Sequence, residues 1–120
     1  MLIDRVNRSL KIDITTAIAT TPMCSAVEYE DVIQEKVTPQ EYLNAALIAG
    51  AGFICPAPAN GNTARNIKAF NIVNSDTVTH DIAVYILDDV TKVYLKFQTA
   101  MPVKSSLHYS VFHGWSLITA

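Results

Sequence analysis

The feature that most constrains the fold of this chain is an alternation of apolar and polar residues with a period of two. In segment 91–98, Val93, Leu95 and Phe97 are apolar and alternate with polar residues, and Tyr94 is the exception. Such alternation is typical of a half-buried antiparallel strand, because successive side chains of a strand point to opposite faces. We therefore expect segment 91–98 to be a strand with these three apolar side chains on its buried face.

Similar segments recur along the chain, with turn residues between them. In segment 9–18, Leu10, Ile12 and Ile14 share one face of a strand. Further strands are expected over segments 23–33, 51–58, 65–73, 81–87, 107–111 and 115–118. About eight short strands at this spacing favour a sandwich or barrel. The sequence thus predicts an all-β fold over residues 1–120, a single antiparallel β-sandwich or jelly-roll-like domain.

Segment 34–52 interrupts this pattern. Residues 38–41 contain a threonine suited to an N-cap, a proline at the first helical position and a glutamate at the third, as in a capping box. A helix cannot extend far, because Gly50 and Gly52 follow within about two turns. We expect at most one short helical turn over residues 39–44, in an otherwise irregular segment.

The composition indicates an assembled protein. Half of the 120 residues are hydrophobic and 17% are charged, whereas roughly 25% is usual for soluble domains. A small domain has little interior, so we expect part of the apolar surface to lie in subunit interfaces. The formal net charge of -2 argues against direct binding of nucleic acid. The longest apolar run, 45–56, is too short to span a bilayer, and no secretory signal is visible.

No catalytic, cofactor or metal site is predicted. His80, His108 and His113 fall on separate strands or turns, without a carboxylate or cysteine at ligand spacing. Serines near His108 lack a nucleophile elbow and an orienting third residue. Cys24 and Cys55 are expected to be small buried hydrophobic residues, although a disulfide between them stays open.

Two further patterns have both a functional and a structural interpretation. The acidic cluster of Glu28, Glu30 and Asp31 is compatible with paired catalytic carboxylates, but a solubilising strand face is the more common arrangement. The aromatic residues are compatible with a carbohydrate groove or with core and interface anchors, and we favour the second. These are Tyr42, Tyr85, Tyr94, Tyr109 and Trp115.

The second half of the chain carries a resemblance to a known class of proteins. Segments 63–74, 78–88 and 107–109, followed by Gly114 and Trp115, resemble the strand and turn pattern of small virion proteins of tailed bacteriophages. The resemblance implies a non-enzymatic capsid cement or decoration protein that binds the major capsid protein in the virion after synthesis in the host cytoplasm, often as a trimer. A tail, baseplate or fibre-attachment module is the alternative it leaves open, and a carbohydrate-binding β-sandwich is a third class.

Two apolar segments are not explained by strand alternation and are expected to contact partners. They are segments 1–7 and 37–53. The first belongs to an N-terminal arm over residues 1–8, and the second overlaps the segment 34–52, where this chain departs from the Gly/Thr-rich pattern of the virion proteins it resembles. The expected partner-binding residues are Leu2, Ile3, Val6, Tyr42, Leu43, Leu47, Ile48 and Phe53.

Overall fold

The structure is a computed structural model. In the part of the chain that it describes, the fold is built from ten strands. The structure describes residues 1–3 and 6–120. Residues 4–5 of the predicted N-terminal arm lie outside the described residues, as does the side chain of Lys92. The strands are β1 (Leu2–Ile3), β2 (Arg8–Ile14), β3 (Met23–Ile33), β4 (Lys36–Leu47), β5 (Gly50–Cys55), β6 (Thr63–Val73), β7 (His80–Asp88), β8 (Lys92–Met101), β9 (Ser106–Ser110) and β10 (Gly114–Ile118).

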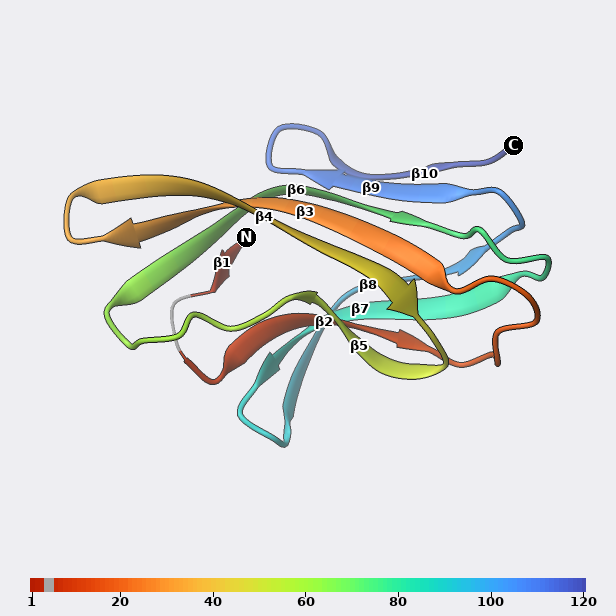
Figure 1. The fold of residues 1–120 in the computed structure, drawn as a ribbon, viewed down its shortest axis with the longest axis horizontal. Helices are drawn as coiled ribbons and strands as arrows, with labels where there is room; N and C mark the ends of the chain where they lie inside the picture. The colour runs from red at the N-terminus through yellow and green to blue at the C-terminus, as the bar shows by residue number, and fades with distance from the viewer. Residues whose placement is uncertain (4–5) are drawn as a thin grey trace.

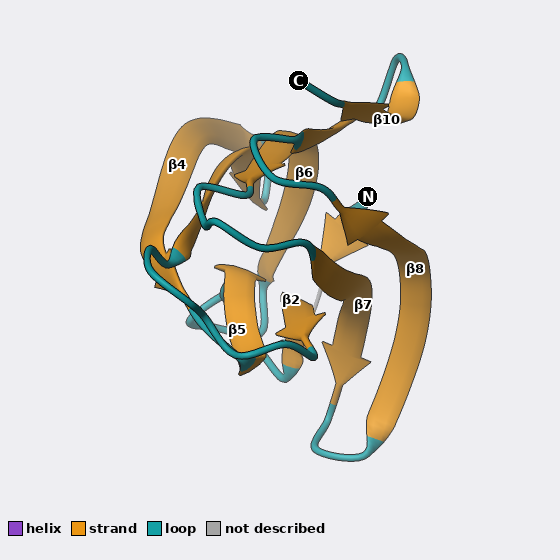
Figure 2. Ribbon diagram, turned by 90° about the vertical axis from the view of Figure 1, so that its right-hand side faces the viewer, coloured by secondary structure: helices purple, strands orange, loops and turns teal. Residues whose placement is uncertain are grey.

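These strands form two antiparallel sheets that pack face to face (Figures 1 and 2). Sheet A has the order β10-β9-β6-β3-β4, and the short β1 pairs with β6. Sheet B has the order β5-β2-β7-β8. The predicted all-β, two-layered sandwich is confirmed, and no helix occurs among the described residues.

The core lies between the two sheets and follows the period of two in the strands that supply it. In β2, Leu10, Ile12 and Ile14 are buried as predicted, and Lys11 and Asp13 face outward. The other fully buried large side chains all come from strands of the two sheets. They are Ile3, Met23, Leu47, Ile54, Ile67, Ile72, Ile82, Met101 and Leu107.

A β-bulge explains why β6 is apolar on both faces in the sequence. The register of β6 against β3 shifts after the pair Ala69–Glu28, so that Ile67 rather than Lys68 lies opposite Tyr29. The extra residue changes which face each side chain occupies. Ile67 and Phe70 are therefore both buried between the sheets although they are three residues apart.

A second bulge overturns the predicted burial in segment 91–98. The register between β7 and β8 shifts so that Val84 pairs with Phe97 and Tyr85 pairs with Leu95, which leaves Lys96 as the extra residue. Phe97 consequently points into the core, whereas Leu95 lies on the outer face and is 59% exposed. The strand was predicted correctly, but its three apolar residues do not share a buried face.

The helical turn that the sequence allowed over residues 39–44 does not form, and segment 34–52 is largely strand rather than irregular. Those residues belong to β4, which pairs with β3 in an unbroken register from Lys36 to Asn44. The hydrogen bonds between β4 and β3 outweigh the local capping pattern, because local helix propensity is weak compared with tertiary strand pairing. Pro39 is tolerated because β4 is the edge strand of sheet A.

An aromatic cluster closes the sandwich on the side of β8 and β10. The rings of Phe97 from sheet B and Trp115 from sheet A stack with centroids 4.6 Å apart. Tyr109 and Phe70 pack on the same indole at 5.0 Å and 5.4 Å. Tyr109 and Trp115 are therefore packed against the core, as expected for core anchors, rather than presented on a flat outer surface.

Candidate functional site

The outer face of sheet A carries a shallow trough that runs across five strands. Two neighbouring rows of paired residues form it, and each row takes one residue from each strand. The first row is Glu41, Glu28, Ala69, Ser110 and Gly114, and the second is Leu43, Ala26, Asn71, His108 and Ser116. Paired residues in a sheet point to the same face, so these side chains border one continuous surface.

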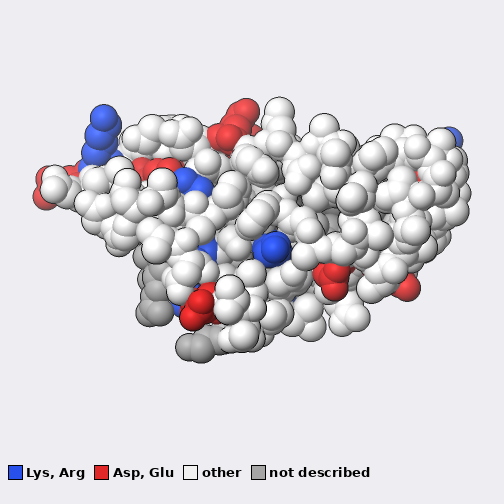
Figure 3. Space-filling view, turned by 60° about the horizontal axis from the view of Figure 1, so that its bottom comes forward, with Lys and Arg blue, Asp and Glu red and all other residues white. Residues whose placement is uncertain are grey.

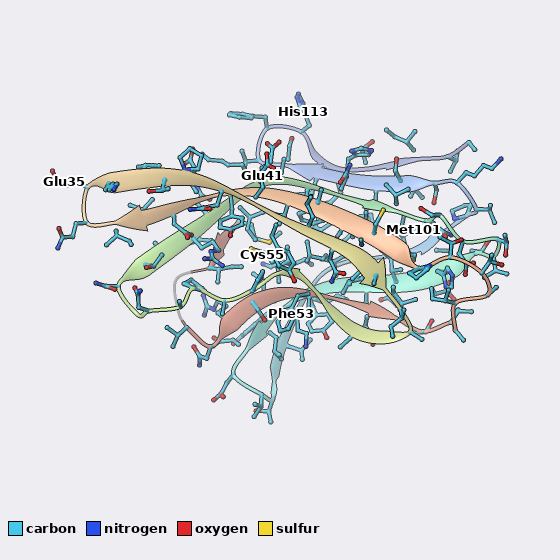
Figure 4. All side chains as sticks on the ribbon, in the orientation of Figure 1. Glu35, Glu41, Phe53, Cys55, Met101 and His113 are labelled. Carbon is cyan, nitrogen blue, oxygen red and sulfur yellow. The ribbon has the colours of Figure 1, made fainter. Side chains whose placement is uncertain are left out.

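The trough is hollow because its central residues are small. Ala26, Ala69 and Ser110 occupy the middle strands, where larger side chains would fill the space. The hollow has a volume of about 450 Å³, and Leu43 and His113 border it at opposite sides of the sheet. Figure 4 places Glu41 and His113 on this upper sheet and Phe53 on the lower one. Such a hollow can accommodate a segment or side chain of another molecule.

Two carboxylates lie side by side at the β4 end of the trough. Glu28 and Glu41 are directly opposite each other on β3 and β4, a like-charge arrangement that costs free energy. Neither forms an ion pair or hydrogen bond with another residue that the structure describes. Glu28 and Glu41 stand on the same wall of the trough. This arrangement differs from that of the paired carboxylates of a glycosidase, which flank the bond that they break.

The acidic cluster predicted from the sequence is divided between two faces. Glu30 lies on the outer face with Glu28 and is 3.5 Å from the ammonium of Lys68. Asp31 points the other way and accepts two hydrogen bonds, of 2.8 Å and 3.0 Å, from the guanidinium of Arg65. The cluster therefore does not act as one group.

The three histidines have different surroundings. His80 is completely buried, whereas His108 and His113 border the trough. Nε2 of His108 lies 2.9 Å from the hydroxyl of Ser106, and no hydrogen bond joins His108 to a carboxylate among the described residues. The described residues contain no group of three or more His, Cys, Asp and Glu side chains able to hold a metal ion.

A buried polar cluster at one end of the sandwich holds the connecting loops together. Both carboxylate oxygens of Asp76 accept hydrogen bonds, from the backbone N–H groups of 19–21 at 2.8–3.1 Å and from Thr77 at 2.9 Å. Burial alone would raise the pKa of Asp76, but these hydrogen bonds and the one with His80 lower that pKa well below its usual range. The cluster is closed to solvent, so its role is structural.

Both cysteines are free thiols. Cys55 lies between the sheets (Figure 4), and burial raises the pKa of its thiol to about 11. A thiol with so high a pKa is almost entirely protonated at neutral pH and is a poor nucleophile. The expectation that Cys55 is a small buried hydrophobic residue is confirmed, whereas Cys24 is half-buried.

The residues predicted to bind partners do not form one surface. Ile3 and Leu47 are wrong as partner contacts, since they are 0% and 1% exposed in the chain's own core. Leu47 fills space that a side chain at Gly52 would otherwise take, with its Cδ2 only 2.9 Å from the position of a Cβ there. Tyr42 packs partly against the core. The exposed members are Leu2, Val6, Leu43, Ile48 and Phe53.

Sheet B carries an exposed apolar surface. Of its residues, the sequence analysis named only Phe53 as a partner contact. The outward side chains of β5, β7 and β8 form what we call the apolar sheet-B face, namely Phe53, Tyr85, Leu87, Val93 and Leu95. Figure 3, which brings the lower side of Figure 1 forward, shows few charged side chains there. The apolar residues of segments 81–87 and 91–98 were the sequence pattern that could have indicated this face. Only the bulge at Lys96, however, determines which of these residues point outward.

No match was found in comparisons with protein-family models, curated proteins and solved structures. A search of the described residues for a helix capable of crossing a membrane also found none.

Proposed function

We propose that this chain is a non-enzymatic structural component of a tailed-bacteriophage particle, a capsid decoration protein that binds the major capsid protein. The observation that carries the proposal is the trough on sheet A, with the carboxylates of Glu28 and Glu41 directly opposite each other at one end and the exposed side chain of Leu43 beside them. The particle itself is proposed from the resemblance of the second half of the sequence.

The chemistry of the trough favours docking of another protein. Leu43 is 69% exposed, and its burial against a partner would contribute about 1–2 kcal/mol. A lysine or arginine of the partner placed between Glu28 and Glu41 would relieve their mutual repulsion, which gives the contact a defined register. The walls supply several hydrogen-bonding groups, including Asn71 and His108, as is usual at protein interfaces.

A tail, baseplate or fibre-attachment module is the second candidate, and copy number separates the two. Quantitative mass spectrometry of purified particles should give about one copy per coat subunit for a decoration protein. A few to a few dozen copies per particle would favour the tail module. Absence of the protein from particles would overturn both versions of the proposal.

The docking surface is tested with particles that lack the protein and with purified variants added back. We expect Glu41→Lys and Leu43→Glu each to reduce occupancy at least about ten-fold. The matched control is Leu95→Glu, which changes a similarly exposed leucine on the opposite sheet and should bind normally. Normal binding of both trough variants would contradict the proposed surface, whatever the copy number.

A further inference from the structure

The outer face of sheet B has two adjacent rows of opposite character. The first row across the sheet contains Phe53, Lys11, Tyr85 and Leu95. The next row contains Ala51, Asp13, Ala83 and Gln98. The first row therefore presents two aromatic rings, a leucine and a positive charge, whereas the second presents two alanines, a glutamine and a negative charge.

The two charges, Lys11 and Asp13, lie next to each other on the same strand. Lys11 and Asp13 are two residues apart on β2, so their side chains leave the same face about 7 Å apart. The ammonium of Lys11 lies over the ring of Phe53, 4.7 Å from its centroid. Neither charge is paired with an oppositely charged side chain within the described residues.

This face is complementary to itself. We infer that a second copy of the chain packs on the outer face of sheet B, about a two-fold axis that passes over β2 at the level of Ile12. A two-fold axis in the plane between two facing sheets, perpendicular to β2, superposes the first row of one copy on the second row of the other. Lys11 then faces Asp13 of the second copy, and the reverse contact forms at the same time.

The same operation matches large side chains with small ones. Phe53 of one copy faces Ala51 of the other, and Tyr85 faces Ala83, so each ring meets a methyl group. Facing sheets pack about 10 Å apart when their side chains interdigitate in this way. Leu95 faces Gln98, and the interface also covers the exposed apolar surface of β8.

The size of the face sets the expected affinity. Four strands about 4.8 Å apart and roughly seven residues long cover roughly 450 Å² in plan, below the usual value of about 800 Å² per partner. We therefore expect a weak dimer that dissociates in the micromolar range. The inference concerns the sheet opposite the trough and does not depend on the function proposed above.

Sedimentation velocity of the full chain over about 1–300 µM tests the inference. We expect a monomer–dimer equilibrium with a dissociation constant in the micromolar range. Lys11→Asp places two carboxylates together at each contact, and Asp13→Lys places two ammonium groups together. Each single variant should weaken the dimer at least about ten-fold, and the double variant Lys11→Asp/Asp13→Lys should restore it to within about three-fold.

The control is Glu28→Lys, a charge reversal on the other sheet that should leave the dimer unchanged. The restored double variant also guards against the single variants being merely misfolded. A protein that stays monomeric at all concentrations would overturn the inference, as would a trimer or a dimer indifferent to both single reversals. A monomer whose binding to particles requires Leu95 would assign this face to the coat protein instead, and would overturn it as well.

Discussion

The carboxylate of Asp76 lies 2.8 Å from Nε2 of His80, and both side chains are closed off from solvent. The same carboxylate accepts hydrogen bonds from backbone N–H groups of the β2–β3 loop. One buried charge thus fixes the β2–β3 connection against the β6–β7 connection, fifty-five or more residues later in the chain. Nδ1 of His80 is buried without a partner among the described residues, so the hydrogen bond of Nε2 to Asp76 is the one that orients the imidazole there.

This arrangement predicts a loss of stability in acid. The hydrogen bonds hold the pKa of Asp76 below its ordinary value of 3.8 in the folded protein, so the unfolded chain binds the proton first. The stabilisation is complete above that ordinary pKa and is lost as the pH falls from there toward the lower folded-state pKa. Urea unfolding from about pH 6 to about pH 2.5 measures this dependence.

Asp76→Asn is the control for the acid effect. It removes the titrating group, so the variant should be less stable at pH 6 and should lose less stability than the parent between pH 4 and lower values. Unfolding curves of the two proteins that shift in parallel across this range would contradict the assignment to Asp76.

The backbone conformation of Lys104 leads us to expect that a glycine there stabilises the protein. It lies at the third position of a four-residue turn closed by the N–H of Ser105 and the carbonyl of Pro102 at 3.1 Å, and its φ of 63° is in the left-handed region. Glycine adopts this conformation without steric cost. Lys104→Gly should raise the free energy of unfolding by about 0.5–1 kcal/mol. Val103→Gly, at the preceding position, should lower it; equal effects of the two changes would argue against this explanation.

The stacked pair of Phe97 and Trp115 gives the folded state an optical signature. Trp115 is the single tryptophan of the chain, and its ring contacts residues from both sheets. Phe97→Ala should destabilise the protein by about 2–4 kcal/mol through loss of buried aromatic contacts. It should also shift the fluorescence of Trp115 to longer wavelength in the folded state. An unchanged spectrum would show that Phe97 does not shield the indole.

At position 65 we expect that a positive charge alone does not maintain the stability of the fold. Its guanidinium donates to both carboxylate oxygens of Asp31 and to the carbonyl of Pro56, and it lies over the ring of Tyr29 at 4.4 Å. A lysine keeps the charge but cannot form this two-pronged contact. Arg65→Lys should cost about 1–3 kcal/mol of stability in thermal unfolding. Lys68→Arg, at an exposed ion pair, should be nearly neutral.

The strands that pair in regular register were predictable from the sequence, and those with bulges were predictable only in part. β2 pairs with β7 in an unbroken register, and from Leu10 onward its burial alternates, so the buried face of Leu10 and Ile12 follows directly from the period of two. In β8 the extra residue at Lys96 moves Leu95 to the outer face. The residues around Lys96 do not indicate the shift in register, because the shift arises from the pairing of β8 with another strand.

The trough was not predictable for a related reason. Its emptiness depends on Ala26, Ala69 and Ser110 lying side by side, and this juxtaposition follows from the register of three strands. Each residue alone is an ordinary small side chain in a strand. By contrast, the helical turn allowed near Pro39 rested on a definite local pattern, and the long-range pairing of β4 with β3 overrides that pattern.

Pro39 has a consequence for behaviour at high concentration. β4 is the longest strand of sheet A and leaves one side without a neighbour. Proline is tolerated in a strand where its missing N–H would have faced away from the paired neighbour. A strand from another molecule that aligned along β4 would thus find no N–H group at the fourth of its twelve residues. Pro39 therefore opposes the pairing of β4 with a strand of another molecule along the first part of this edge.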